Sequence, residues 1–267
     1  MSEIALPQEL LALARIAATA AAELVVAGRP EVIAKKSSVA TKSSATDPVT
    51  EMDKAAEKLI VATIKSSRPL DGFIGEEGSS ELGETGISWA IDPIDGTVNY
   101  MYGLPVWAVS VAAMQAGEVI AGCLVAPDLN KTYYGSKGGG GWVESNAIAT
   151  KLKVLPSSDL SQCLLATGFA YQKARRAQIA PVIAQVLPQV RDLRRMGAAS
   201  IDIVSVATGG VDAYVESGVR IWDYAAALLI ATEAGAEFIH REQPWGEWLL
   251  VARPGLTELL EPITNQL

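Results

Sequence analysis

The spacing of apolar residues predicts two helices near the start of the chain. Alanine and leucine recur at helical spacing over residues 7–28, and Gly28 and Pro30 predict the end of that helix. A polar segment rich in Ser, Thr and Lys follows over 35–47, where the absence of periodicity predicts a loop. A second helix is predicted over 50–66, with alanine, leucine and isoleucine on one face.

The pattern beyond the second helix predicts strands and then a change of rhythm near residue 150. Brief apolar runs bounded by turn residues predict strands at 72–75, 89–91, 107–114, 119–125, 132–135 and 142–144. Farther on, strands at 163–168, 211–215, 237–240 and 248–251 are interspersed with helices at 174–190, 198–208 and 223–234. Such alternation favours a parallel sheet. We therefore predict an α+β half over 1–150 and an α/β half over 151–267.

Composition narrows the class of protein. With 267 residues the chain is long enough for one large domain or two small ones. A net charge of −8 argues against binding nucleic acid over a broad surface, which requires a basic face. It does not argue against small phosphate esters, because a bound cation can hold them. The two cysteines, Cys123 and Cys163, lie in apolar runs and are expected to be buried thiols.

The N-terminal region does not indicate a membrane or a secretory protein. Glu3 and Glu9 precede the apolar stretch, which is the wrong charge for a signal peptide. Arg15 and Glu23 interrupt that stretch, so we predict no transmembrane span and expect a cytoplasmic protein.

Acidic residues cluster in four short segments with turn residues around them. The segments are DPVTEMD at 47–53, GEE at 75–77, DPIDGT at 92–97 and WDYAA at 222–226. They fall at predicted strand ends and helix starts, where ligand crevices form in open α/β sheets. If the acids converge, their mutual repulsion requires protons or cations. Oxygen ligands without His or Cys favour Mg²⁺ or Mn²⁺ over zinc.

Each acid also has a purely structural interpretation. Asp53 can form a capping box with Thr50, and Asp223 can complement the dipole at the start of a helix. Glu76 can be a solvated loop acid, and DPIDG can be an ordinary turn. Their shared position at element ends, rather than their residue type, favours a ligand site.

Several enzyme classes are disfavoured by what the sequence lacks. The only histidine, His240, lies outside all four segments, which argues against a histidine phosphatase, a Ser-His-Asp hydrolase and a His-ligated metal site. The chain has neither a P-loop sequence nor a Gly-x-Gly-x-x-Gly that opens a helix. The glycine run at 138–141 is interpreted as a hairpin turn rather than a phosphate loop.

The four segments, in this order, resemble the inositol monophosphatase family of Mg²⁺-dependent, Li⁺-sensitive phosphatases. DPIDGT followed by WDYAA is highly specific, and the wording TDPVT and DGTVNYMYGLP is similar to the bacterial branch. The resemblance implies a layered αβαβα sandwich of the inositol monophosphatase and fructose-1,6-bisphosphatase type. It also implies hydrolysis of a small phosphate monoester by metal-activated water, with two or three Mg²⁺ ions or Mn²⁺. A homodimer that binds neither nucleic acid nor membrane is expected.

The resemblance also assigns roles to individual residues. The implied metal ligands are the side chains of Glu76, Asp92, Asp95 and Asp223 and the carbonyl of Ile94. Asp53 and Thr97 are expected to orient the nucleophilic water, and Glu76 is counted with them as catalytic. The expected substrate contacts are Asp95, Gly96, Thr97, Gly197, Ala199 and Glu216.

The substrate is less well determined than the reaction. Glu216 favours a polyol such as inositol 1-phosphate. Histidinol phosphate, fructose 1,6-bisphosphate and 3′-phosphoadenosine 5′-phosphate are alternatives, because the enzymes that act on them share these motifs. A non-catalytic protein that binds a partner is an alternative of a different class. Ala198 stands where the family often has Ser or Thr, and residues 240–253 lack the family's usual Asn-containing segment.

Overall fold

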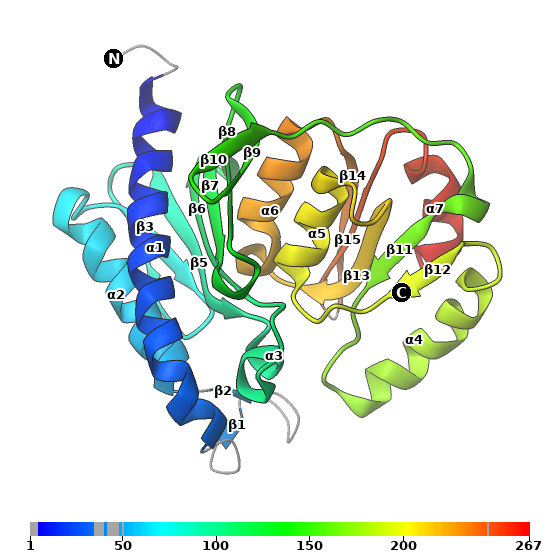
Figure 1. Ribbon diagram of the computed structural model, residues 1–267, viewed down its shortest axis with the longest axis horizontal. Coiled ribbons are helices and arrows are strands. Elements are labelled where there is room, and N and C mark those ends of the chain that lie inside the picture. The colour runs from blue at the N-terminus through cyan, green and yellow to red at the C-terminus, as the bar shows by residue number, and fades with distance from the viewer. Residues whose placement is uncertain (1–4, 35–39, 42–47, 50, 245) are drawn as a thin grey trace.

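The protein is a sandwich of five layers, two sheets and three layers of helices (Figure 1). The computed structural model describes residues 5–34, 40–41, 48–49, 51–244 and 246–267. Helices α1 and α2 cover the outer face of the first sheet, α5 and α6 lie between the sheets, and α4 and α7 cover the far face of the second (Figure 1). The predicted αβαβα architecture is thus confirmed.

Helix α1 (Ala5–Ala34) continues past the residues expected to end it. The prediction of an end at Gly28 and Pro30 was wrong, because Gly28 serves a different purpose. A Cβ at Gly28 would overlap the Met52 methyl group on α2 (Glu51–Ser67), so this glycine permits close approach of the two helices. Pro30 lies inside the helix, at the cost of one backbone hydrogen bond.

Helix α1 is long and apolar enough, by length and composition only, to cross a membrane. Its alanine-rich face is buried, however, against α2 and strands of the first sheet. A buried helix in the core of a protein can have the same length and hydropathy as a membrane-spanning helix. The alanines with zero exposure are Ala14, Ala17, Ala18 and Ala21.

Most of the predicted loop over 35–47, together with Thr50, lies outside the described residues. Two short strands near it are described: β1 (Ala40–Thr41) pairs antiparallel with β2 (Pro48–Val49).

The first sheet contains all six strands predicted between 72 and 144. Its eight strands run in the order β10-β9-β8-β7-β6-β5-β3-β4, and only β3 and β5 are parallel. Strands β4 and β10 were not predicted; both are short and exposed. The bounds are β3 (Gly72–Gly75), β4 (Ser80–Glu81), β5 (Ile87–Asp95), β6 (Ala108–Gln115), β7 (Glu118–Ala126), β8 (Lys131–Ser136), β9 (Gly140–Ser145) and β10 (Ile148–Lys151). A six-residue helix, α3 (Thr97–Tyr102), follows β5, and the predicted glycine turn joins β8 to β9.

The second sheet is mixed rather than parallel. Its order is β12 (Asp192–Arg194), β11 (Leu164–Thr167), β13 (Ala213–Val219), β15 (Gly246–Ala252) and β14 (Glu237–Gln243). The parallel prediction holds for β11 and β13 but is wrong for β14 and β15. Strand β12, which was not predicted, pairs parallel with β11. Strands β14 and β15 form a tight hairpin, and a hairpin must be antiparallel. Outside this sheet lie α4 (Lys173–Val186) and α7 (Thr257–Thr264).

The middle layer joins the two halves of the chain through one core. Helices α5 (Ala199–Thr208) and α6 (Ile221–Glu233) are buried between the sheets. At Gly122 on β7, a Cβ would lie 2.8 Å from the Ala226 Cα, so the glycine lets α6 lie against the first sheet. The apolar cluster includes Leu124 from one half and Leu249 from the other. Each half also buries a cluster of its own, one within residues 10–125 and one within residues 163–267. The division near residue 150 stays a prediction, since the shared cluster joins the two halves.

Both cysteines are buried and free, as predicted. Burial raises the pKa of each thiol to about 12, so neither is a thiolate at neutral pH.

Candidate active site

A cavity of about 390 Å³ lies where the end of β5 meets the starts of α5 and α6. Elements from both halves of the chain contribute to its wall. The predicted site residues that line it are Glu76, Asp92, Ile94, Asp95, Gly96, Thr97, Gly197, Ala199, Glu216 and Asp223. Asp53, the remaining predicted residue, lies behind the wall next to Thr97. Residues spread over 170 positions of sequence, about two thirds of the chain, thus form one site.

Two neighbouring strands place the first pair of acids. Glu76 directly follows β3, and its N–H donates to the Ile91 carbonyl of β5 at 3.2 Å, which continues the parallel pairing. The carboxyl ends of adjacent parallel strands therefore place Glu76 beside Asp92. Asp92 Oδ1 accepts the N–H of Ile94 at 3.0 Å, an Asx-type contact at the point in β5 where its pairing with β6 shifts register.

Glu57 supports the loop that carries Glu76. It lies one helical turn after Asp53 on α2 and is 4% exposed. Its carboxylate accepts the N–H groups of Glu77 at 2.8 Å and Ser79 at 2.9 Å. A Cβ at Gly75 would lie 2.5 Å from Glu57 Oε2, which explains the glycine. We did not predict Glu57 from the sequence, although its spacing of four residues from Asp53 was a usable signal.

Asp95 is held by the start of α5. Its carboxylate accepts the N–H of Ala199 at 3.1 Å, the N–H of Ser200 at 2.8 Å, and the Ser200 hydroxyl. A helix N-terminus is a favourable partner for a carboxylate. Ala199 therefore contributes a backbone contact to Asp95 as well as lining the cavity. Ser200 was missed, because a serine in a first helical turn has no distinguishing signal in a single sequence.

Asp223 combines the two roles considered for it. It lies in the first turn of α6, and its Oδ2 accepts the Arg220 N–H at 2.6 Å, as a capping acid does. It is also half-buried in the cavity wall. Capping fixes the carboxylate without removing it from the site.

Burial and mutual repulsion raise the pKa values of these acids. Burial is the main cause for Asp92, whose pKa lies well above its usual range; the charges of Glu76, Asp95 and Asp223 raise it further. Burial also raises the pKa of Asp95 to about 6 against the opposing hydrogen bonds from Ser200. The pKa of Asp223 is raised by burial and then by Glu76. The ionised forms are therefore costly unless a positive charge lies among them.

The donor set fits a hard divalent cation. Carboxylate oxygens and one backbone carbonyl are the ligands Mg²⁺ prefers, and no His or Cys lines the cavity. Within the described part of the chain, no three Asp, Glu, His or Cys side chains already form a complete metal-binding group. Acids at this spacing are expected to draw together around a cation, because like charges repel and opposite charges attract.

Thr97 links the cavity to Asp53. The Thr97 hydroxyl lies 3.5 Å from Asp53 Oδ1 and 2.9 Å from the Ile94 carbonyl oxygen. A hydroxyl has only one proton to donate, so the carbonyl is the closer of two competing acceptors. Asp53 is fully buried. Its alternative capping partner, Thr50, lies outside the described residues.

The wall of the cavity also carries a second set of polar residues, from β13 and α5. Glu216 on β13 accepts a hydrogen bond from the Tyr214 hydroxyl at 3.0 Å, and a Cβ at Gly168 would overlap its carboxylate. Burial raises the pKa of Glu216 to about 7. Burial, with Glu216 and Asp95, also raises the pKa of Asp202 to about 8, against the opposing charge of Arg195. Asp202 was missed because an acid in a first helical turn looks like a cap.

These pKa values predict a pH-dependent stability in the presence of a chelator. Asp95, Glu216 and Asp202 have pKa values of about 6, 7 and 8, above those near about 4 in an unfolded chain. A raised carboxyl pKa stabilises the fold fully below the unfolded value and loses that contribution as pH rises through the folded value. We expect Tm to fall between about pH 4 and pH 8, and Mg²⁺ to raise Tm more at the higher pH.

Thermal unfolding in chelator, with and without added Mg²⁺, tests this expectation. The Asp202→Asn variant should lose part of the decline around pH 8, because its amide does not ionise. A Tm that rises steadily across the same range would contradict the assignment of raised pKa values to the cavity.

Comparison with known proteins agrees with the fold and gives the family. The family model described as "Inositol monophosphatase family" matches residues 6–263. A Mycobacterium leprae protein named inositol-1-monophosphatase is 41% identical, and the match covers 95% of this chain and 92% of that one. The solved structure of Mycobacterium tuberculosis SuhB superposes with a TM-score of 0.84 at 35% identity, with 97% of each chain covered. A Xylella fastidiosa relative, 37% identical over 73% of this chain and 69% of its own, is named Nus factor SuhB.

The fold and the acidic cavity are those of a phosphatase of the layered αβαβα type. The chain belongs to the inositol monophosphatase family.

Proposed function

We propose that this protein is a Mg²⁺-dependent phosphate monoester hydrolase that acts on inositol 1-phosphate. The observation that carries the proposal is the convergence in one cavity of Glu76, Asp92, Asp95 and Asp223 with Thr97 and Glu216. Acids at one end of the cavity suit cations that hold a phosphate, and Glu216 at the other end suits a polyol.

The side chains of Glu76, Asp92, Asp95 and Asp223, with the Ile94 carbonyl, would hold the metal. When bound, Mg²⁺ supplies Lewis acidity, which offsets the negative charge of the phosphate and makes water a better nucleophile. Two or three Mg²⁺ ions, or Mn²⁺ in their place, suit the number of oxygen donors. Li⁺ sensitivity, a homodimer and a cytoplasmic location belong to the same proposal, by family membership.

The remaining residues act on water and substrate. Asp53 and Thr97 orient the attacking water: the Thr97 hydroxyl donates toward Asp53 or the Ile94 carbonyl, which leaves its oxygen lone pair to accept from water. Gly96 and Thr97 line the cavity, and their backbone N–H groups would donate to the phosphate. Glu216 accepts hydrogen bonds from hydroxyls of the leaving alcohol.

A screen of phosphate esters tests the proposal against its alternatives on the same framework. Release of phosphate would be measured with inositol 1-phosphate, histidinol phosphate, fructose 1,6-bisphosphate and 3′-phosphoadenosine 5′-phosphate at equal concentrations. The highest kcat/KM is expected for inositol 1-phosphate. A preference for another ester would retain the phosphatase assignment and replace the substrate.

Glu216 is predicted to determine the preference for a polyol. Glu216→Gln keeps the size of the side chain and removes its charge, and a charge-assisted hydrogen bond contributes roughly 1.5–3 kcal/mol. We expect kcat/KM for inositol 1-phosphate to fall about 10-fold or more. Hydrolysis of 4-nitrophenyl phosphate, whose leaving group has no hydroxyls, should change little.

Steady-state kinetics with both substrates separates this role from a structural one. Glu242→Gln on exposed β14 is the matched control and should leave both substrates unaffected. Equal losses for the two substrates in Glu216→Gln would contradict a role in hydroxyl recognition.

The relatives named Nus factor SuhB raise a partner-binding role as a second candidate. Such a role does not need the metal-ligating acids, yet all four are present and line the cavity. We therefore propose catalysis as the primary function. A folded protein that releases no phosphate from any of the four esters with Mg²⁺ would favour the second candidate.

A further inference from the structure

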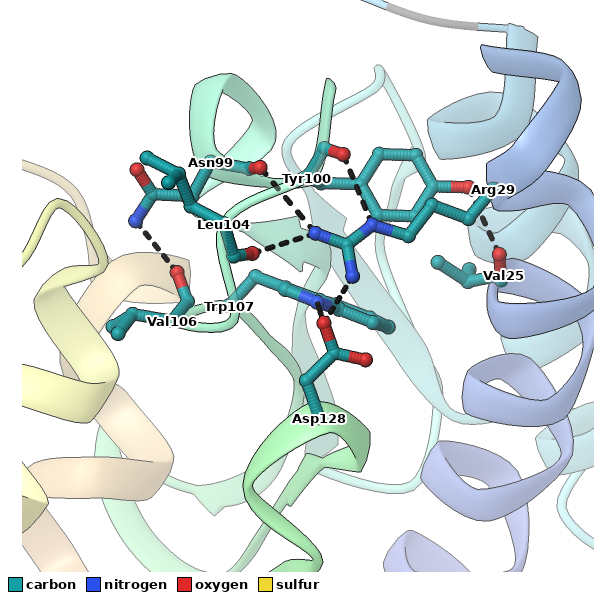
Figure 2. Close-up of polar contacts among 8 residues, drawn as sticks. All are labelled: Val25, Arg29, Asn99, Tyr100, Leu104, Val106, Trp107 and Asp128. Carbon is teal, nitrogen blue, oxygen red and sulfur yellow. Dashed lines mark hydrogen bonds and ion pairs between the residues drawn. The ribbon is translucent and has the colours of Figure 1, made fainter. Parts of the chain in front are cut away.

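A buried polar network lies behind the cavity, centred on Arg29 of α1 (Figure 2). Arg29 is 9% exposed. Its guanidinium donates through Nε to the Tyr100 carbonyl at 3.0 Å, and through Nη2 to the carbonyls of Leu104 at 2.6 Å and Asn99 at 3.4 Å. Nη1 donates to the carboxylate of Asp128. Arg29 thus fastens the last carbonyls of α3 and the turn after it to α1.

Aromatic side chains complete the same attachment. The Arg29 guanidinium lies 5.3 Å from the ring centres of Tyr100 and Trp107. Trp107 donates to Asp128 at 3.0 Å, and the Tyr100 hydroxyl donates to the Val25 carbonyl of α1 at 2.9 Å (Figure 2). A helix of six residues is not stable alone, and a cation near its C-terminus favours it. The placement of α3 therefore depends on this network.

Asn99 connects α3 to the segment at 195–198, of which Arg195, Gly197 and Ala198 line the cavity. Its Nδ2 donates to the Val106 carbonyl at 2.6 Å and to the Met196 carbonyl at 2.8 Å. Asn99 lies two residues after Thr97, and Met196 directly precedes Gly197. At Gly197, where φ is +93°, a Cβ would lie 2.9 Å from Asn99 Nδ2, so the two segments are in close contact. One amide group thus joins α3 to the segment whose Gly197 N–H hydrogen-bonds Asp202, and Asp202 interacts with Glu216.

We propose that Arg29 and Asn99 are positioning residues: Arg29 fixes the phosphate end of the cavity, and Asn99 fixes its distance from the alcohol end. The inference rests on the proposed phosphatase function. Neither residue lines the cavity, so neither touches substrate. A substrate that contacts both ends requires the correct spacing, whereas one that contacts only the phosphate end does not. The two residues are therefore expected to have different kinetic signatures.

Asn99→Ser removes the reach of the side chain and should affect a polyol ester selectively. We expect kcat/KM to fall about 10-fold or more for inositol 1-phosphate and less than about threefold for 4-nitrophenyl phosphate, because small misplacements of a substrate are costly. Arg29→Lys keeps the charge but loses the planar fork, and should lower kcat for both esters by a similar factor. Asn265→Ser, at the exposed end of α7, is the matched control.

Hydrogen exchange gives a readout that does not depend on activity. Asn99→Ser should speed amide exchange both over 96–104 and over 195–200, whereas Arg29→Lys should speed it over 96–104 alone. Exchange would be followed at a fixed interval below the Tm of each variant, so that global destabilisation is matched. If Asn99→Ser does not fold, Asn99→Gln, which keeps the amide donor but displaces it by one methylene, takes its place.

The outcomes separate this proposal from the proposed function. Selective loss of the polyol ester with faster exchange in both segments would support it. Equal kinetic losses for the two esters in the Asn99 variant, or faster exchange over 96–104 only, would overturn it. If the wild-type protein hydrolyses neither ester, the proposed function fails, and the exchange result alone decides whether Asn99 holds the two segments together.

Discussion

Replacing Asp92 with asparagine is expected to lower kcat for inositol 1-phosphate by about 10²–10³-fold or more, the scale for losing one electrostatic stabiliser of a transition state. Asp92 lies among the other cavity acids: burial raises its pKa, and the charges of Glu76, Asp95 and Asp223 raise it further. The asparagine oxygen can still accept the Ile94 N–H that Asp92 accepts at 3.0 Å, so the local turn should persist. The measurement is the initial rate of phosphate release at saturating Mg²⁺.

The same variant has a distinctive stability. Removing a buried charge that its neighbours disfavour should leave Tm in chelator equal to that of the wild type, or higher, and reduce the gain in Tm on adding Mg²⁺. Asp192→Asn, at an exposed aspartate of β12, is the control and should change neither quantity. A wild-type rate in Asp92→Asn would show that this acid does not hold the metal.

Asp53→Asn and Thr97→Ala are each expected to lower kcat by about 10²–10⁴-fold, the range of general acid–base assistance. The two side chains lie 3.5 Å apart, and only Thr97 lines the cavity. Asp53 must then act through Thr97 or through the water that both orient. We therefore expect the double variant to be little slower than the slower single variant.

A double-mutant cycle on kcat measures that coupling. Multiplicative losses would contradict a shared role and would favour a capping role for Asp53 at the start of α2. Thr63→Ala, whose hydroxyl donates within α2 to the Leu59 carbonyl at 2.8 Å, controls for the loss of a threonine hydroxyl elsewhere.

Hydrophobic periodicity predicted most elements of the fold, but its interruptions were harder to interpret. Gly28 and Pro30 are residues that often end helices, yet α1 continues past both. Gly28 is needed instead for the close packing of α1 against Met52. Alternation of strands and helices predicted a parallel sheet, but β14 and β15 follow each other directly and pair antiparallel as a hairpin. The alternation pattern gives no information about such a hairpin. Contacts between distant segments decide such cases.

The candidate site could be predicted where an acidic residue type coincided with a position at the end of a strand or the start of a helix. Acids at the ends of strands and the starts of helices were recognisable, and the cavity brings them together. Residues that act through backbone groups were not recognisable. Ser200 binds Asp95, and Asn99 binds the Met196 carbonyl, across about 100 residues of sequence in each case. The residues around Ser200 and Asn99 in the sequence give no indication of these distant hydrogen-bond partners.

Phosphate release from inositol 1-phosphate, measured on chelator-treated protein before and after Mg²⁺ is added, tests the central claim most directly. We expect no turnover in chelator, turnover that rises with Mg²⁺ to saturation, and no recovery in Asp92→Asn at the same Mg²⁺ concentrations. Turnover that is the same with and without Mg²⁺, or its absence from a folded wild-type protein saturated with Mg²⁺, would contradict Mg²⁺-dependent hydrolysis at this cavity.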